Sequence, residues 1–85
     1  MKKYRVKVEI RLKPGILDAE GRTIERAIRR FGLDVSNTRK GKIIEFEIEA
    51  EDRSTVENKV RNLAENLLIN PLTEEFVLEV RGEEA

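Results

Sequence analysis

Hydrophobic and charged residues alternate over residues 3–13, with apolar side chains at the even positions from Tyr4 to Leu12. This period of two is that of a strand with one buried face. Pro14 and Gly15 follow, and they end the strand because proline has no backbone N–H and glycine opens positive φ. The pattern therefore predicts a strand that stops at a sharp corner.

The spacing changes to that of a helix after Asp18, whose side chain can accept hydrogen bonds from the free N–H groups of a first helical turn. Gly32 is typical of the residue that follows a helix. We predict a helix over residues 19–31, in which Gly21 permits the close approach of another backbone segment. Its apolar stripe is Ile24, Ala27, Ile28 and Phe31.

Two further strands are predicted over residues 33–39 and 43–50, joined by a two-residue turn at Lys40-Gly41. This turn sets Val35 opposite Phe46, so that apolar side chains face each other.

The outward face of residues 43–50 is acidic, whereas that of the first strand is mostly positive. Opposite charges on neighbouring strands contribute about 0.2–1 kcal/mol per pair, so we expect these two strands to be adjacent. Same-face residues lie about 6.8 Å apart along one strand, a spacing that does not by itself assemble a metal or acid–base site. The side chains are Glu45, Glu47 and Glu49 on one strand and Arg5, Lys7 and Arg11 on the other.

A second helix is predicted to begin near Asp52 or Ser54 and to end before Asn70-Pro71, because the residue before proline disfavours helical geometry. Its apolar stripe is Val56, Val60, Leu63 and Leu67. Alternation over residues 75–81 predicts a last strand, and residues 83–85 read as a frayed tail.

This order of elements is that of the split βαβ, ferredoxin-like motif. We therefore expect an α+β fold, a βαββαβ two-layer sandwich. Its four-stranded antiparallel sheet should have the order 4-1-3-2, with both helices on one face. Residues 1–82 would form a single domain. Tracing the strand directions brings three turns to one edge of the sheet, at residues 13–18, 40–41 and 70–71.

Bare sheet edges, together with Ile43 and Val77 exposed on the open sheet face, predict a homo-oligomer. A chain of 85 residues allows one small domain. Because 17 basic residues balance 17 acidic ones, no net field attracts nucleic acid or anionic lipid. The sequence contains no apolar run long enough to span a membrane, so we expect a soluble, cytoplasmic protein.

The sequence contains neither cysteine nor histidine. It therefore lacks the commonest general base and the commonest nucleophile–base pair, and a self-contained hydrolase or transferase is not expected. No Gly-rich phosphate-binding motif is present.

Three segments together resemble the PurS family, the small subunit of phosphoribosylformylglycinamidine synthase. They are Leu12-Lys13-Pro14-Gly15-Ile16-Leu17-Asp18 with Gly21, Gly41-Lys42 leading into Ile44-Glu45-Phe46, and Leu67-Leu68-Ile69-Asn70-Pro71 with Glu74 and Phe76. The resemblance spans essentially the whole chain. Two departures are Ala19, where the family often has proline, and Lys40, where its hairpin often has valine.

The resemblance implies a non-catalytic subunit of a glutamine-dependent, ATP-driven C–N ligase of purine biosynthesis. A large subunit would bind ATP, Mg and formylglycinamide ribonucleotide, and a glutaminase subunit would release ammonia. This chain would bridge the two and hold no cofactor or metal of its own. We expect the turn-bearing edge to supply the partner contacts, through Lys13, Pro14, Gly15, Asp18, Lys40, Gly41, Lys42 and Asn70.

Two other classes share the predicted topology. An ACT-type domain would bind a small molecule, often an amino acid, although nothing in the sequence marks a pocket. An RNA-binding module would need aromatic side chains on the open sheet face, where this chain carries Arg, Lys and Glu.

Overall fold

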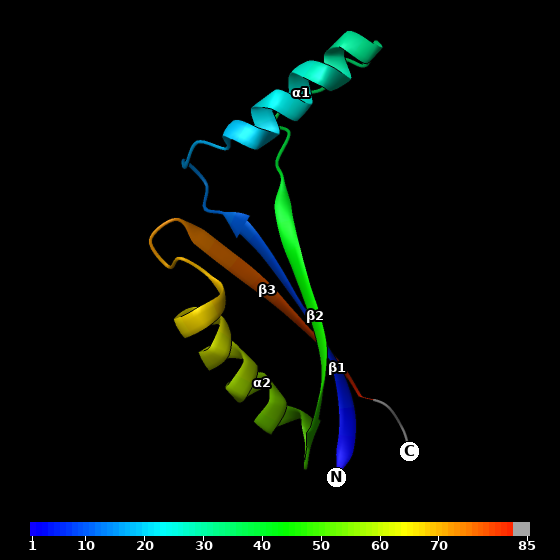
Figure 1. Ribbon diagram of the computed structural model, residues 1–85, viewed down its shortest axis with the longest axis vertical. Helices are drawn as coiled ribbons and strands as arrows, with labels where there is room; N and C mark the ends of the chain where they lie inside the picture. The colour runs from blue at the N-terminus through cyan, green and yellow to red at the C-terminus, as the bar shows by residue number, and fades with distance from the viewer. Residues whose placement is uncertain (83–85) are drawn as a thin grey trace.

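The computed structural model describes residues 1–82 and has an antiparallel sheet of three strands in the order β2-β1-β3 (Figure 1). The elements are β1 (Lys2–Leu12), α1 (Ala19–Phe31), β2 (Gly41–Ala50), α2 (Arg53–Leu63), a π-helical turn η1 (Ala64–Leu68) that continues α2, and β3 (Glu74–Gly82). The predicted tail, residues 83–85, lies outside the described residues, and the assignment of residues 1–82 to one domain stays a prediction.

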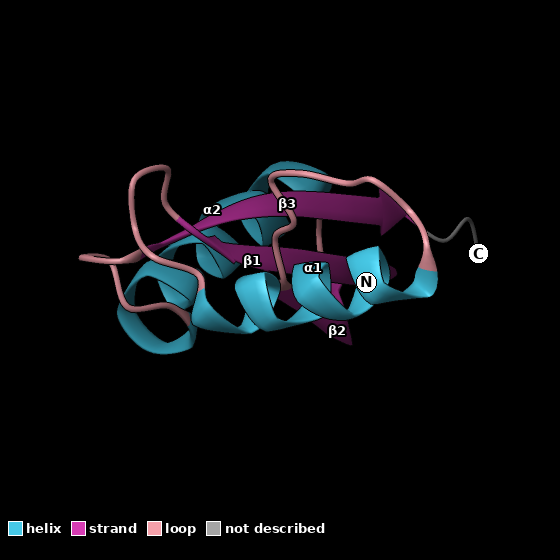
Figure 2. Cartoon of the chain, turned by 90° about the horizontal axis from the view of Figure 1, so that it is seen from above, coloured by secondary structure: helices cyan, strands magenta, loops and turns pink. Residues whose placement is uncertain are grey.

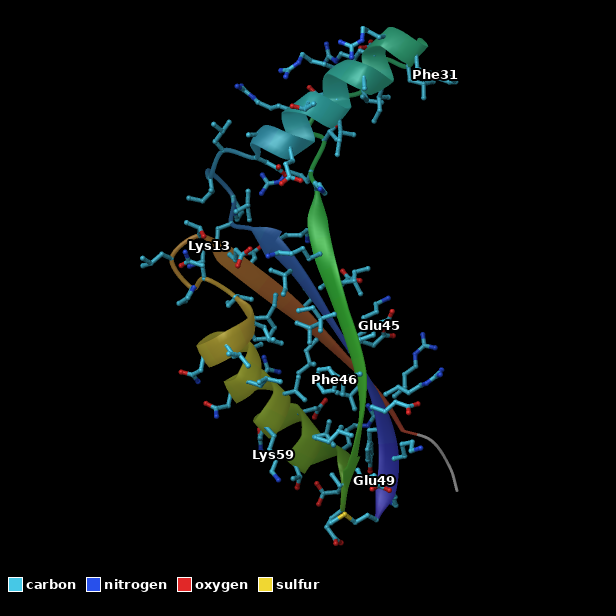
Figure 3. The ribbon with its side chains drawn as sticks, viewed as in Figure 1. Lys13, Phe31, Glu45, Phe46, Glu49 and Lys59 are labelled. Carbon is cyan, nitrogen blue, oxygen red and sulfur yellow. The ribbon has the colours of Figure 1, made fainter. Side chains whose placement is uncertain are left out.

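The central strand is β1, which pairs with β2 on one side and β3 on the other. Its even-numbered side chains face α2, and Val8 lies between Ile44 of β2 and Leu78 of β3 in the register. In Figure 3, Phe46 lies on the side of β2 toward α2, whereas Glu45 points to the other side. The buried core consists of Tyr4, Val6, Val8, Ile10, Ala50, Val56, Val60, Ala64 and Val80.

The open face of the sheet carries the charges that predicted the β1–β2 pairing. Lys7 lies opposite Glu45 and Glu79 in the register, and its Nζ is 3.7 Å from the Glu79 carboxylate. Arg5 lies opposite Glu47, with 3.5 Å between guanidinium and carboxylate. The predicted adjacency of these strands is confirmed. These pairs are exposed, so each contributes little stability but helps to fix which strands pair.

Helix α2 begins as its N-cap predicts, because the Asp52 carboxylate accepts a hydrogen bond from the Thr55 N–H at 2.7 Å. Val56 and Val60 are buried against the sheet. The helix then widens into η1, whose Ala64 is also buried.

The sheet has three strands, so the predicted four-stranded sheet in the order 4-1-3-2 is wrong. Residues 33–40 form no strand, and β2 begins at Gly41, opposite Arg11. The segment is tied to α1 instead: Arg29 Nε donates to the Val35 carbonyl at 2.9 Å, and the Thr38 N–H donates to Glu25 at 3.0 Å. The backbone groups of Val35 and Thr38 are thus bonded to the helix, and the predicted pairing of Val35 with Phe46 does not form.

The prediction that both helices cover one face of the sheet is also wrong, because α1 points away from the sheet (Figure 1). In Figure 2, which looks down the long axis, α1 lies in front of the strands. The radius of gyration is 16.5 Å, against about 12 Å for a compact chain of this length. We call residues 19–40 the arm, and the sheet with α2 and η1 the body.

Replacing Ile10 by alanine tests the core. Ile10 is 1% exposed beneath α2, so the cavity should lower the free energy of unfolding by about 2–5 kcal/mol. Val77→Ala, on the open face at 54% exposure, should lower it by less than about 1 kcal/mol. Chemical denaturation at one fixed protein concentration measures both. Equal losses in the two variants would contradict this description of the core.

Candidate interaction site at the rim

Three connections meet where β1 leaves the sheet, namely residues 13–18, 38–41 and 70–73, and we call this end of the body the rim. The Lys13 N–H donates to the Thr73 carbonyl at 2.8 Å, and Lys13 Nζ donates to the Pro71 carbonyl at 2.6 Å. The Lys40 N–H donates to the Asp18 carboxylate at 2.9 Å. The predicted meeting of the three turns is therefore confirmed; Lys13 is labelled in Figure 3.

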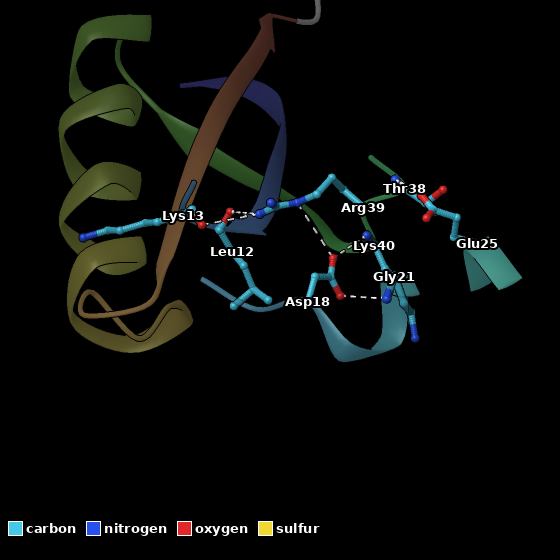
Figure 4. Close-up of polar contacts among 8 residues, drawn as sticks. All are labelled: Leu12, Lys13, Asp18, Gly21, Glu25, Thr38, Arg39 and Lys40. Atoms are coloured by element: carbon cyan, nitrogen blue, oxygen red, sulfur yellow. Dashed lines mark hydrogen bonds and ion pairs between the residues drawn. The ribbon is translucent and has the colours of Figure 1, made fainter. Parts of the chain in front are cut away.

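The Asp18 side chain is 9% exposed and lies at the centre of the connection between body and arm (Figure 4). Its Oδ1 accepts from the Gly21 N–H at 2.8 Å, the N-cap contact that the sequence predicted. Its Oδ2 accepts from the Lys40 N–H and lies 3.9 Å from Arg39 Nε. The bonds from Lys40 and Gly21 stabilise the charged form, so they lower the pKa of the Asp18 carboxyl below its usual 3.8.

Arg39 extends this contact to the end of β1. One guanidinium nitrogen, Nη2, lies 2.6 Å from the Leu12 carbonyl oxygen and 3.4 Å from that of Lys13, and it donates to both. Arg39 was not among the predicted site residues, because no local pattern distinguishes it from the other exposed arginines of the arm.

Gly21 permits the return segment to pass against the first turn of α1. A Cβ at this position would lie 2.6 Å from the Thr38 carbonyl oxygen, so no larger residue fits without displacing backbone. The predicted close approach at Gly21 is thus confirmed. One turn later, the Thr38 N–H donates to Glu25, and this bond lowers the pKa of the Glu25 carboxyl.

The turn over residues 70–73 is held by its own side chains. Asn70 Oδ1 accepts from the Leu72 N–H at 3.0 Å, and the Asn70 N–H donates to Glu74 at 2.7 Å. This second bond, and then Lys42 at 3.3 Å, lower the pKa of the Glu74 carboxyl. The turn is consequently rigid and projects Leu72, which is 82% exposed.

Most of the predicted partner-contact residues are engaged within the chain. Lys13, Asp18, Lys42 and Asn70 make the bonds described above, and Lys40 pairs with Glu20, which raises the pKa of the Lys40 amine. Pro14 and Gly15 form the corner, where Gly15 has a φ of +87°. Gly41 packs so closely that a Cβ would lie 2.6 Å from the Ile10 carbonyl oxygen. These residues build the rim, and their contact with a partner stays a prediction.

The exposed leucines of the rim escaped the sequence analysis. Leu17 is 64% exposed on the corner and Leu72 is 82% exposed on the facing turn. Between the start of α1 and β2 lies a depression of about 380 Å³. Rigid turns that present large apolar side chains are suited to binding a protein surface.

Within residues 1–82 there is no group of three or more acidic side chains placed to hold a metal ion. The same residues include no helix long and apolar enough to cross a membrane. The rim consists of hydrogen-bonded backbone, ion pairs and exposed leucines, which are groups suited to binding a protein partner.

Comparison with known proteins identifies the family. The profile described as "PurS: Phosphoribosylformylglycinamidine (FGAM) synthase" matches residues 5–82. The PurS subunit of Methanothermobacter thermautotrophicus is 36% identical over 74 residues, covering 87% of this chain and 88% of the relative. The PurS subunit of Thermotoga maritima is 37% identical over 74 residues, covering 86% of this chain and 90% of the relative.

Solved structures agree with this match. The crystal structure of Methanocaldococcus jannaschii PurS superimposes with a TM-score of 0.84 at 34% identity, covering 95% of this chain and 99% of that one. A chain in the PurLQS structure of Thermotoga maritima superimposes with a TM-score of 0.84 at 36% identity, covering 98% and 100%.

The fold is that of a small α+β protein with a surface suited to binding a partner. The chain belongs to the PurS family and is an accessory subunit of phosphoribosylformylglycinamidine synthase, an enzyme of purine biosynthesis. The resemblance seen in the sequence is confirmed, and the ACT-type and RNA-binding alternatives are not favoured.

Acid should destabilise the protein through its bonded carboxyls. The pKa values of Asp18, Glu25, Asp52 and Glu74 are lowered in the folded chain, so the unfolded chain binds more protons near pH 4. The stability that these groups provide is fully present above their usual pKa values of 3.8 and 4.5 and is lost as pH falls through the lowered ones.

We expect the thermal midpoint to stay level from about pH 7 to pH 5 and to fall below about pH 4. The chain contains no histidine to titrate in the upper range. Scanning calorimetry across this range measures the effect, and Asp18→Asn should flatten part of the acid slope. A midpoint that does not change between pH 5 and pH 3 would contradict the assignment.

Proposed function

We propose that this chain is a non-catalytic bridge that joins the ligase and glutaminase subunits of its synthase in the cytoplasm. The observation that carries the proposal is the match over 98% of this chain to a chain of the Thermotoga maritima PurLQS structure. In this proposal ATP and Mg bind to the large partner subunit, and the small chain contributes surfaces only.

The rim is the proposed contact surface for a partner subunit. Its turns are fixed by internal hydrogen bonds, so little ordering entropy is lost when a partner binds them. Leu72 and Leu17 supply the apolar area, and the cations beside them are Lys13 on the corner and Lys42 at the start of β2. An apolar anchor surrounded by polar groups is typical of a binding hot spot.

Leu72→Glu should reduce assembly with the ligase and glutaminase subunits at least about tenfold, because it removes the apolar anchor and buries a charge. The thermal midpoint should change little, since Leu72 is exposed. Val77→Glu also places a glutamate at an exposed apolar position, but on the open sheet face; it is the control and should assemble normally. Co-elution of the mixed subunits and glutamine-dependent activity are the measurements.

Intact co-elution and activity in the Leu72→Glu mixture would move the partner contact away from the turn at residues 70–73. The double substitution Lys13→Glu and Lys42→Glu then tests the flanking cations. If wild-type chain does not co-elute with the larger subunits and is not required for glutamine-dependent activity, the bridging function itself is wrong.

Self-association through the arm is the second part of the proposal. Ile24 is 38% exposed, Phe31 86% and Leu33 56%, so the apolar side of the arm is uncovered (Figure 3). Gly21 is the only buried residue of α1. An isolated helix of 13 residues is marginal in water and depends on packing of its apolar side.

The body offers the complementary surface. Ile44, Phe46 and Ile48 of β2 face the α2 side of the sheet, yet they are only partly buried because no second helix lies over them. A second copy can place its α1 there and receive the first copy's α1 in return. Such an exchange is isologous and closed, as in most symmetric dimers.

The wild-type chain should therefore show at least twice its mass of 9.9 kDa by light scattering at micromolar concentration. Ile24→Glu should weaken association at least about tenfold, because it places a charge in the apolar contact. Arg26→Glu, on the other side of α1, is the control and should associate like the wild type. A wild-type chain that stays monomeric at these concentrations would exclude self-association.

A further inference from the structure

We propose that Asp18 is a positioning residue: its carboxylate fixes the direction of the arm, so that α1 is held off its own sheet and presented to a second copy. This inference rests on the proposed self-association through the arm. It assigns Asp18 a role beyond capping α1, and three observations support it.

The first observation is that the two Asp18 oxygens bind two separate segments. Oδ1 accepts from Gly21 N–H in α1, and Oδ2 accepts from Lys40 N–H, the residue before β2 (Figure 4). An N-cap needs only the first of these bonds. Asp52, the N-cap of α2, provides an internal comparison: among the described residues its carboxylate accepts a hydrogen bond from the Thr55 N–H of its own helix.

The second observation is that the same cluster reaches the body. Arg39 lies 3.9 Å from Asp18 and donates to the Leu12 carbonyl at 2.6 Å, where β1 ends. Both chain crossings between body and arm, at residues 13–18 and 38–41, are therefore joined to one buried carboxylate. Charge-assisted bonds of this kind are stronger than neutral ones.

The third observation is that the base of the arm is closely packed. The Thr38 carbonyl oxygen lies 2.6 Å from where a Cβ on Gly21 would stand, and the Thr38 N–H donates to Glu25 at 3.0 Å. The first two turns of α1 are thus joined to the end of the return segment. We call Asp18 and its partners Gly21, Arg39 and Lys40 the Asp18 cluster; a change in the direction of the arm requires that these contacts break.

A fixed direction matters for association. An arm free to swing would sample many orientations and could also fold back over the uncovered β2 residues Ile44 and Phe46 of its own sheet. Holding it in one orientation removes the competing contact and lowers the entropy lost on binding. The cluster therefore favours contact between copies over contact within one chain.

Asparagine at position 18 separates capping from positioning. Asn is as good an N-cap as Asp, so its oxygen keeps the bond to Gly21. Its amide NH₂ cannot accept from the Lys40 N–H, and the attraction to Arg39 is lost. Asp52→Asn is the matched control, since that cap makes no corresponding bond to a second segment among the described residues.

The test uses the absence of cysteine from the chain. Cysteines introduced at Arg26 on the arm and Lys59 on α2 take spin labels, and labelled chain is diluted into unlabelled chain so that only distances within one chain are measured. Wild type and Asp52→Asn should give one narrow distance distribution. Asp18→Asn should broaden it and weaken association about tenfold, with unchanged helical circular dichroism.

A narrow distribution and unchanged association in Asp18→Asn would overturn the proposal. If Asp18→Asn loses helical signal, Gly21→Ala replaces it: displacement of the Thr38 backbone should broaden the distribution, and a narrow one would likewise overturn the proposal. A monomeric wild type with a narrow distribution that Asp18→Asn broadens would refute self-association yet support the fixing of the arm.

Discussion

The pairing of β1 with two neighbours is the interaction on which the rest of the structure depends. Every residue from Tyr4 to Arg11 has a partner in both β2 and β3, and the even-numbered side chains from Tyr4 to Ile10 are buried. Ion pairs on the open face and apolar contacts beneath α2 use the same register, because a shift by one residue would exchange the two faces. The position of the rim follows from this pairing, because β1 ends at the edge of the sheet where the three connections meet.

The elements that could be predicted are those whose signals are local. Alternation in β1, the caps Asp18 and Asp52, and the stop at Pro71 depend on neighbouring residues alone, and the structure has each of them. The strand predicted over residues 33–39 failed for a physical reason. The alternation of Leu33 and Val35 is typical of any extended segment with one apolar side. It does not distinguish a segment that pairs with a strand from one that lies along a helix. Asn37, with a φ of 57°, interrupts the extended backbone.

The same limit explains the error in placing α1. A stripe of apolar residues predicts that one side of a helix packs against another surface. It does not show which surface that is, or whether the surface belongs to the same chain. The meeting of the turns at the rim was nevertheless predictable. Residues 33–40 run antiparallel to α1 and return the chain to the start of the helix, whether α1 lies along the sheet or points away from it. In both cases β2 starts beside the end of β1. Arg39 and the exposed Leu17 and Leu72 could not be found this way, because their roles depend on contacts between distant segments.

The arm and the body divide the apolar surface of this small accessory subunit between two separate parts of the chain. A compact chain of this length would cover its own apolar surfaces, whereas here the stripe of α1 and the β2 side chains Phe46 and Ile48 stay partly uncovered. Burying the Asp18 carboxylate costs free energy of hydration, and two backbone N–H groups together with Arg39 compensate for this cost. The carboxylate thereby joins the two segments that connect arm and body, and the arm is held in an orientation that leaves its apolar side uncovered.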